Sequence, residues 1–326
     1  MKPKLLIVMA LSNFLFFTSQ LLAASSTETI FQIPLNSFDP FLLQKKIDGA
    51  YDLKNQSYFD YNLYHKSSLF HKRMEEVNLP PLPNLSYEDA LKEAKKLIIV
   101  LKSFVRNGLT YNTLQKRRWI SLANYELEKN GFHLERTQIL TVVDRNPKIQ
   151  NLCFILAFPK YKGDWIVLGG DKISTGSSYR KLYYITPTGV FVNSIDRFGY
   201  RALGTKNKFG IKGNGIKGMR VWDFGWQWAQ KSWLSNQKGQ IRLEMHATDP
   251  VYLEHRLGHP ASEGCIRISA GMNRFIDQYG LIDALFTQAA QKNKRYGAIF
   301  LKGKKRSPLA GQFLIVVDSS EKQNKT

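Results

Sequence analysis

A histidine and a cysteine in the second half of the chain could carry out thiol chemistry together. Cys265 stands between Gly264 and Ile266, and His246 precedes it at the end of a strand-like stretch. A thiol attacks an amide carbonyl only as the thiolate, and an ordinary cysteine, with a pKa near ~8.5, is mostly protonated at neutral pH. A base must therefore assist it, and His246 is the candidate. These residue types predict thiol acyl transfer.

The neighbours of Cys265 could supply the other groups that this chemistry requires. Because glycine leaves the backbone open in a tight turn, the N–H groups of Gly264 and Cys265 could point at the oxyanion that develops during attack. Arg267 lies two residues beyond Cys265. In an extended segment its guanidinium would lie on the same side as the thiol, where it suits a substrate carboxylate. Thr248, two residues beyond His246, could assist the histidine.

A disulfide is the other obvious use of this cysteine. The chain has only two cysteines, and in an exported protein Cys265 could pair with Cys153. Cys153 lies in a strand-like run, whereas Cys265 lies in a glycine turn with a histidine upstream, and this contrast favours the catalytic interpretation.

A metal site is the second alternative. His255 and His259 have the i, i+4 spacing of metal ligands on a helix, and His246 or Cys265 could complete the site. The glycine and proline that flank His259 argue against a helix there. We therefore expect loop histidines and no metal.

This part of the chain resembles the L,D-transpeptidase (YkuD) family. The family signature is a histidine, a spacer, Ser/Thr-His-Gly-Cys, an apolar residue, and Asn or Arg. Here fifteen residues separate His246 from Ser262, which opens the run Ser-Glu-Gly-Cys-Ile-Arg. The similarity extends to Ile173–Gly176 and Thr186–Phe191, which look like the strand and turn that open the family's catalytic domain, and to Phe313–Asp318, which looks like its last strand. About half of the chain is covered.

The resemblance implies a role for each matching residue. Cys265 would be the nucleophile, with Gly264 as a main-chain oxyanion donor. His246 would be the general base, held in one tautomer by the main-chain carbonyl of Ala247. The residues expected to bind substrate are Arg267, Thr248 and Ser262. Glu263 departs from the family pattern, which most often has histidine there; the departure leaves the base in place and concerns substrate access beside the nucleophile.

The resemblance also implies an activity on peptidoglycan stem peptides. Cys265 would expel the terminal D-alanine and hold the donor as a thioester, which an amine of a second stem peptide or of a wall-attached protein would resolve. No cofactor or metal is implied. The same residues with water as the acceptor would make an L,D-carboxypeptidase or endopeptidase, and Glu263 leaves a non-catalytic peptidoglycan-binding protein open as a third class.

Residues 1–24 resemble a cleavable export signal. Lys2 and Lys4 precede an apolar run over 5–22, and small residues follow at Ala23 and Ala24. We expect an exported protein of the periplasm or cell envelope. The alternative is that this segment is not cleaved and anchors the protein in the membrane. Otherwise any membrane contact would be peripheral.

The charge of the chain is strongly positive and limits the partners. Losing Lys2 and Lys4 with the signal leaves +19 of the formal +21, which favours approach to a polyanion. Cell-wall peptides and lipid phosphates fit an exported protein. Nucleic acid is not expected, because no nucleic-acid-binding module is recognisable.

Two further patterns have competing interpretations. Residues 213–218 spell G-x-G-x-x-G, but that pattern indicates dinucleotide binding only between a strand and a helix, and no helical pattern follows it. We expect a loop near the active site. Four tryptophans lie between Trp222 and Trp233; they could pack in the core or form an aromatic wall for a sugar or peptide.

We predict an α+β fold. A β-rich, L,D-transpeptidase-like catalytic domain of mixed sheets with flanking helices is expected over 136–320, after a smaller, mainly helical region over 25–135 and before a polar tail over 321–326. Apolar periodicity predicts a helix that starts at Ser86 and ends at Asn107-Gly108. The other predicted helices cover 113–129, 271–280 and 281–292. The predicted strands cover 138–143, 152–158, 164–168, 182–185, 189–193, 241–245 and 313–318.

Overall fold

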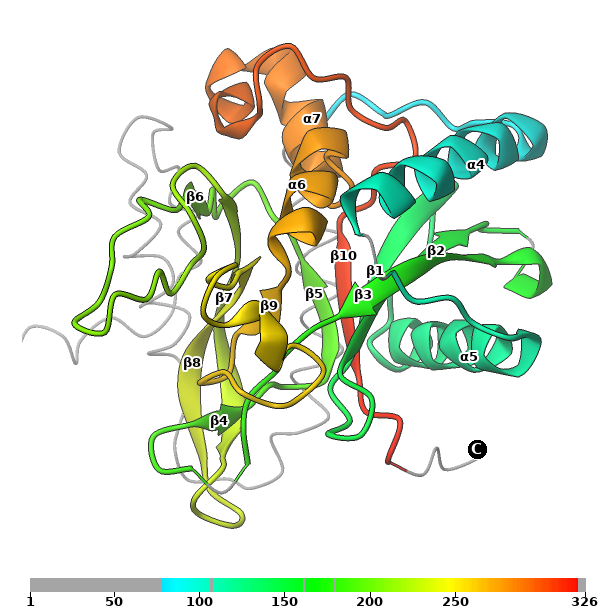
Figure 1. Ribbon diagram of the computed structural model, residues 1–326. Helices are drawn as coiled ribbons and strands as arrows, with labels where there is room; N and C mark the ends of the chain where they lie inside the picture. Colours follow the sequence, from blue (N-terminus) through cyan, green and yellow to red (C-terminus); the bar gives the residue numbers. More distant parts are fainter. Residues whose placement is uncertain (1–77, 106–107, 161, 179, 322–326) are drawn as a thin grey trace, which may run out of the picture. The chain divides into compact units, whose positions relative to one another are not determined.

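The computed structural model is a mixed α+β fold with two mixed β-sheets (Figure 1). It describes residues 78–105, 108–160, 162–178 and 180–321. The signal predicted over 1–24 and most of the polar tail lie outside these residues. None of the helices in the described ranges is long and apolar enough to cross a membrane.

Side-chain caps explain where the first two helices begin. Helix α4, Tyr87–Phe104, starts after Ser86, whose hydroxyl accepts a backbone N–H of the first turn at 3.1 Å. Helix α5, Thr113–Lys129, starts with a capping box in which Asn112 and Gln115 each accept the other's backbone N–H at 2.9 Å. Both helices were predicted from the sequence, and both are confirmed.

The larger sheet carries the main core. Its strand order is β3-β2-β1-β10-β5, and only the β1–β10 pair is parallel. The strands are β1 Gln138–Asp144, β2 Asn151–Ala157, β3 Ile166–Lys172, β5 Gly189–Val192 and β10 Phe313–Val317. Every residue of β1 and of β10 is buried, which requires cover on both faces of the sheet. Figure 1 shows α4 and α5 on opposite sides of it.

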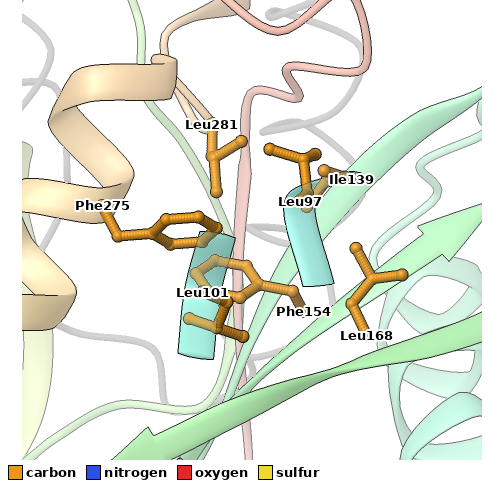
Figure 2. Close-up of a pocket in the computed structure, with 7 residues that line it drawn as sticks. All are labelled: Leu97, Leu101, Ile139, Phe154, Leu168, Phe275 and Leu281. Atoms are coloured by element: carbon orange, nitrogen blue, oxygen red, sulfur yellow. The ribbon is translucent and has the colours of Figure 1, made fainter. Parts of the chain in front are cut away.

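Helices α4 and α6 pack on one face of this sheet through apolar side chains (Figure 2). Helix α6 spans Ala270–Tyr279. The residues that meet there are Leu97, Leu101, Ile139, Phe154, Leu168, Phe275 and Leu281, and they leave no room for a water molecule. This region is therefore packed core rather than a binding site. Helices α4 and α5 share this core with the sheet, while the boundary predicted between residues 135 and 136 stays a prediction.

The smaller sheet has the order β4-β7-β8-β9, with β6 also paired to β7. Its strands are β4 Tyr184–Ile185, β6 Tyr200–Arg201, β7 Arg220–Lys231, β8 Lys238–Ala247 and β9 Ile266–Ile268. Strands β7 and β8 form a long antiparallel pair whose register shifts between Asp223 and Trp226. Gly225 lies in that bulge with φ +78°. Strand β9 pairs parallel to β8.

A buried polar cluster joins the two sheets. Asp283 stands before helix α7, Ala284–Lys292, and its Oδ1 accepts from the indole of Trp222 at 3.1 Å and from the amide of Asn193 at 2.8 Å. The guanidinium of Arg220 lies 3.7 Å from the same oxygen. Because these residues come from β7, from the end of β5 and from the start of α7, the cluster sets how the two sheets meet.

Two predicted strand boundaries are wrong for local reasons. The strand predicted over 164–168 begins at Ile166, after a 3-10 turn η1 over Lys162–Asp164, and continues to Lys172 because Gly169, at φ +134°, accommodates a bulge. The strand predicted over 182–185 is limited to β4, because Leu182 has a left-handed φ of 66°. The remaining short helices are η2 Glu254–Arg256 and η3 Lys294–Ile299.

Candidate active site around Cys265

The register of two adjacent strands brings the predicted site residues together. In the parallel β8–β9 pair His246 lies opposite Arg267, and Cys265 immediately precedes β9. Alternation along β8 places Arg242, Glu244 and His246 on one face, while Leu243 and Met245 are buried in the core beneath. Cys265 thus enters the sheet beside Glu244 and His246 (Figure 1 shows β8 and β9 side by side).

The imidazole of His246 is buried and held in one orientation. Its Nδ1 lies 2.8 Å from the main-chain oxygen of Ala247. A carbonyl can only accept, so Nδ1 carries the proton and Nε2 is left as the proton acceptor. Burial lowers the pKa of His246 to about 4, with the charge of Arg267 acting in the same direction and the Ala247 hydrogen bond opposing it. The ring is therefore a neutral base at neutral pH.

The thiol of Cys265 rests in its protonated form. It donates to the main-chain oxygen of Arg242 at 3.7 Å. Burial raises the pKa of the thiol to about 11; a backbone hydrogen bond at Glu244 and the charge of Arg267 oppose the rise, and the charges of Glu244 and Glu263 add to it. Within the described residues no hydrogen bond joins the thiol to the imidazole. Thiol and imidazole therefore rest as a neutral pair.

The turn before Cys265 is fixed by two hydroxyl groups. Ser262 donates to the main-chain oxygen of Cys265 at 2.5 Å and accepts the N–H of Gly264 at 3.1 Å. Thr186 donates to the main-chain oxygen of Gly264 at 2.7 Å and accepts the N–H of Gly176 at 2.9 Å. The oxyanion role predicted for the Gly264 N–H therefore requires a substrate oxygen to displace Ser262.

Glycine is required at position 264 for two reasons. Its φ is +135°, which side-chain-bearing residues rarely adopt, and a Cβ there would lie 2.7 Å from Ile241 Cδ1. The turn that carries the cysteine is therefore tightly specified by its surroundings.

The guanidinium of Arg267 has a hydrogen-bond donor that no described residue uses. Its Nη1 donates to the main-chain oxygen of Ala261 at 3.1 Å, while its Nε is buried without a hydrogen-bond partner in the described residues. Its charge also acts on both the thiol and the imidazole. The hydroxyl of Thr248 is likewise buried and unpartnered within the described ranges. Two of the three predicted substrate-binding side chains, Arg267 and Thr248, thus have hydrogen-bonding groups without a partner in the described residues, whereas the hydroxyl of Ser262 donates one hydrogen bond and accepts another.

Two residues beside Cys265 were missed by the sequence analysis. Glu244 accepts from the hydroxyl of Tyr200 at 3.3 Å, and that hydroxyl in turn accepts from the amide of Asn214 at 2.8 Å. The alternation of polar and apolar residues along 241–246 was a signal for Glu244. No local signal identified Tyr200, because β6 reaches the site only through pairing with β7.

The glycine-rich stretch 213–218 is a loop at the site. A Cβ at Gly215 would lie 2.8 Å from the Cβ of Ala247, so the loop touches the residue after His246. The loop runs into strand β7. A dinucleotide-binding motif would instead lead into a helix. Asp249 holds it in place by accepting the N–H of Lys212 at 2.8 Å.

The tryptophans divide between the two interpretations. Trp222 is fully buried, whereas Trp226 is 41% and Trp228 56% exposed. Trp226 pairs with Arg242 across β7 and β8, and directly paired residues share a face. The exposed indoles therefore lie on the face that carries Cys265 and His246.

The described residues show neither a disulfide at Cys265 nor a cluster of metal-binding side chains around it. Both cysteines are free, and Cys153 is buried within β2 of the other sheet. No group of three or more histidine, cysteine, aspartate or glutamate side chains in the described part of the chain could hold a metal ion. His255 lies in η2 and His259 in a turn.

Comparison of the chain with protein-family models and with curated proteins found no match.

Proposed function

We propose that the protein is an L,D-transpeptidase that acts on peptidoglycan stem peptides through an acyl-enzyme on Cys265. The observation that carries the proposal is the β8–β9 register, which sets a buried, neutral imidazole on the strand beside a thiol in a glycine turn. The resemblance of this segment to the YkuD family supplies the substrate class. The export signal predicted over residues 1–24 and the basic charge fit a protein of the cell envelope.

In the proposed first half-reaction, Cys265 attacks the carbonyl of the diaminopimelate L-centre. The Sγ–C bond forms while His246 Nε2 takes the thiol proton and returns it to the nitrogen of the departing D-alanine. Arg267 binds a stem-peptide carboxylate through its unpaired Nε. In the second half-reaction an amine attacks the thioester, giving a new amide and the free enzyme.

The exposed indoles suit a substrate that contains sugar rings. Trp226 and Trp228 lie on the same sheet face as Cys265, and aromatic faces contact the apolar faces of sugars. This placement supports a glycan-linked stem peptide as the donor.

The test is incubation with purified tetrapeptide muropeptides, followed by mass spectrometry of the products. Cross-linked dimers are the expected result. Free tripeptide alone would assign the site to a hydrolase, and unchanged substrate with retention of the protein on sacculi would assign it to a wall-binding protein.

Matched cysteine variants assign the reaction to one thiol. Cys265→Ala should yield no product, whereas Cys153→Ala, which changes a buried thiol in the other sheet, should keep the wild-type products. Product from Cys265→Ala would exclude the proposed nucleophile.

A further inference from the structure

Glu244 occupies a position between the two predicted catalytic residues and has no role in the mechanism above. It lies on β8 between Arg242 and His246, opposite Asp223 of β7 and beside Cys265. Its Oε2 accepts from the hydroxyl of Tyr200 at 3.3 Å. The carboxylate is therefore oriented from β6 while it remains partly exposed at the site.

The charges around Glu244 leave its carboxylate available to a cation. Asp223 is neutralised by the guanidinium of Arg242, with Nε at 2.9 Å. Arg267, two residues after Cys265, lies opposite His246 in the β8–β9 register, and Glu263, two residues before Cys265, is exposed. Glu244 itself forms no ion pair within the described residues. In a chain of net charge +21, a carboxylate in this position favours a positively charged partner.

A negative charge at Glu244 does not help the first half-reaction. It raises the pKa of the Cys265 thiol and so disfavours the thiolate. Burial, reinforced by Asp223, raises the pKa of Glu244 to about 7, while Tyr200 and Arg242 act to lower it. At neutral pH the group can both accept and return a proton. Once Cys265 is a thioester, no thiolate remains for it to repel.

We propose that Glu244 receives the amine acceptor and takes its proton when the acyl-enzyme is resolved. The inference rests on the proposed function, whose second half-reaction it specifies. The amine nitrogen forms a bond to the thioester carbon and the C–Sγ bond breaks. An acceptor that arrives as an ammonium first releases one proton to solvent. As the neutral amine attacks, its proton leaves the nitrogen for the Glu244 carboxylate and then passes to the Cys265 sulfur, which restores the thiol and the carboxylate. Tyr200 is a positioning residue for this carboxylate.

The two half-reactions can be measured separately with the full-length protein. The donor is a purified tetrapeptide muropeptide and the probe amine is glycinamide. The rate of acyl-enzyme formation and the rate of its amine-dependent loss are followed by intact-protein mass spectrometry from about pH 5.5 to about 9, a range that brackets the raised pKa of Glu244, about 7. Glu244→Gln should form the acyl-enzyme at least as fast as wild type and lose it to the amine about 100-fold more slowly.

The pH profile separates proton transfer from simple positioning. Amine-dependent loss in wild type should rise with pH through about 7 as Glu244 ionises, and Glu244→Gln should lack that rise. Because the Tyr200 hydroxyl lowers the pKa of Glu244, Tyr200→Phe should move the rise to higher pH and keep its plateau. Ionisation of the glycinamide amine also changes the rate with pH, but it does so equally in all variants and therefore does not affect the comparison between them.

Glu263→Gln is the matched control. Glu263 also raises the pKa of the Cys265 thiol, so both glutamine variants remove a charge that acts on the nucleophile. Only Glu244→Gln should lose transfer to the amine. Equal amine-dependent rates in wild type, Glu244→Gln and Tyr200→Phe would overturn the inference while leaving the proposed function intact. Failure of wild type to form any adduct on Cys265 would overturn both.

Discussion

The proton affinities of His246 and Cys265 differ widely in the resting protein. The imidazole has a pKa of about 4 and the thiol one of about 11, so they rest as a neutral pair rather than as thiolate and imidazolium. A neutral thiol reacts slowly with oxidants and alkylating agents. In the proposed reaction, substrate would have to bring thiol, base and carbonyl together, and the resting thiol would undergo few side reactions.

Burial of a neutral His246 should make the protein sensitive to acid. An unfolded histidine has a pKa near ~6.5, so between pH 6.5 and 4 the unfolded chain binds a proton that the folded chain does not. The contribution of His246 to the free energy of unfolding should then decrease by about 3 kcal/mol as the pH falls through this window. Denaturant titrations of wild type and His246→Gln at several pH values measure the difference.

In His246→Gln this part of the pH dependence should be absent. Glu244, whose pKa is raised, contributes the opposite slope in the same range, and it does so in both proteins. The same slope in wild type and variant would show that His246 does not carry the effect.

His246 and Cys265 were predicted from their residue types and from the resemblance to the YkuD family, and the β8–β9 pairing brings the two segments side by side. Glu244 and Tyr200 could not be found in this way. A glutamate within a strand is ordinarily a solvated side chain, and Tyr200 reaches it only through the pairing of β6 with β7.

At the scale of the elements, the turn that carries Cys265 is held by a threonine from a different loop. Thr186 lies between β4 and β5, and its hydroxyl bonds both Gly176 and Gly264. It thereby ties the turn that carries Cys265 to the segment that follows β3. The hydroxyl is fully buried, so neither partner has water as a substitute.

Thr186→Val should therefore lower both stability and activity. The isosteric change leaves a buried N–H and a buried carbonyl without partners, which costs about 1 to 3 kcal/mol, and it releases the turn, so acylation should slow at least about tenfold. Thermal unfolding and the acyl-enzyme rate measure the two effects. Thr188→Val, two residues on at a half-buried position, is the control; equal losses in both variants would contradict this role.

Elements with caps and strong periodicity were predictable, and elements defined by pairing were not. The caps at Ser86 and Asn112 located two helices. Strand β7 was missed because Gly225 interrupts its alternation at the bulge. Strand β9 has three residues, too few for a pattern, and its parallel pairing with β8 joins segments that no local rule connects.

At the scale of the whole molecule, the two sheets have different roles. The larger sheet and its helices form the main apolar core together with the buried faces of β7, β8 and β9, and the smaller sheet also carries the polar face with His246, Glu244 and Cys265. The buried cluster of Arg220 and Asp283 connects them. The net positive charge favours approach to a polyanion, as the proposed cell-wall substrate would require, while the carboxylate beside the thiol suits the proposed amine acceptor.

The most direct test of the central claim is the mass of the protein during turnover with the tetrapeptide donor. We expect an adduct equal to the donor minus its terminal D-alanine, and digestion should place it on the peptide that contains Cys265. The adduct should be absent from Cys265→Ala. An unmodified Cys265 peptide while product accumulates, or an adduct on another residue, would contradict the account.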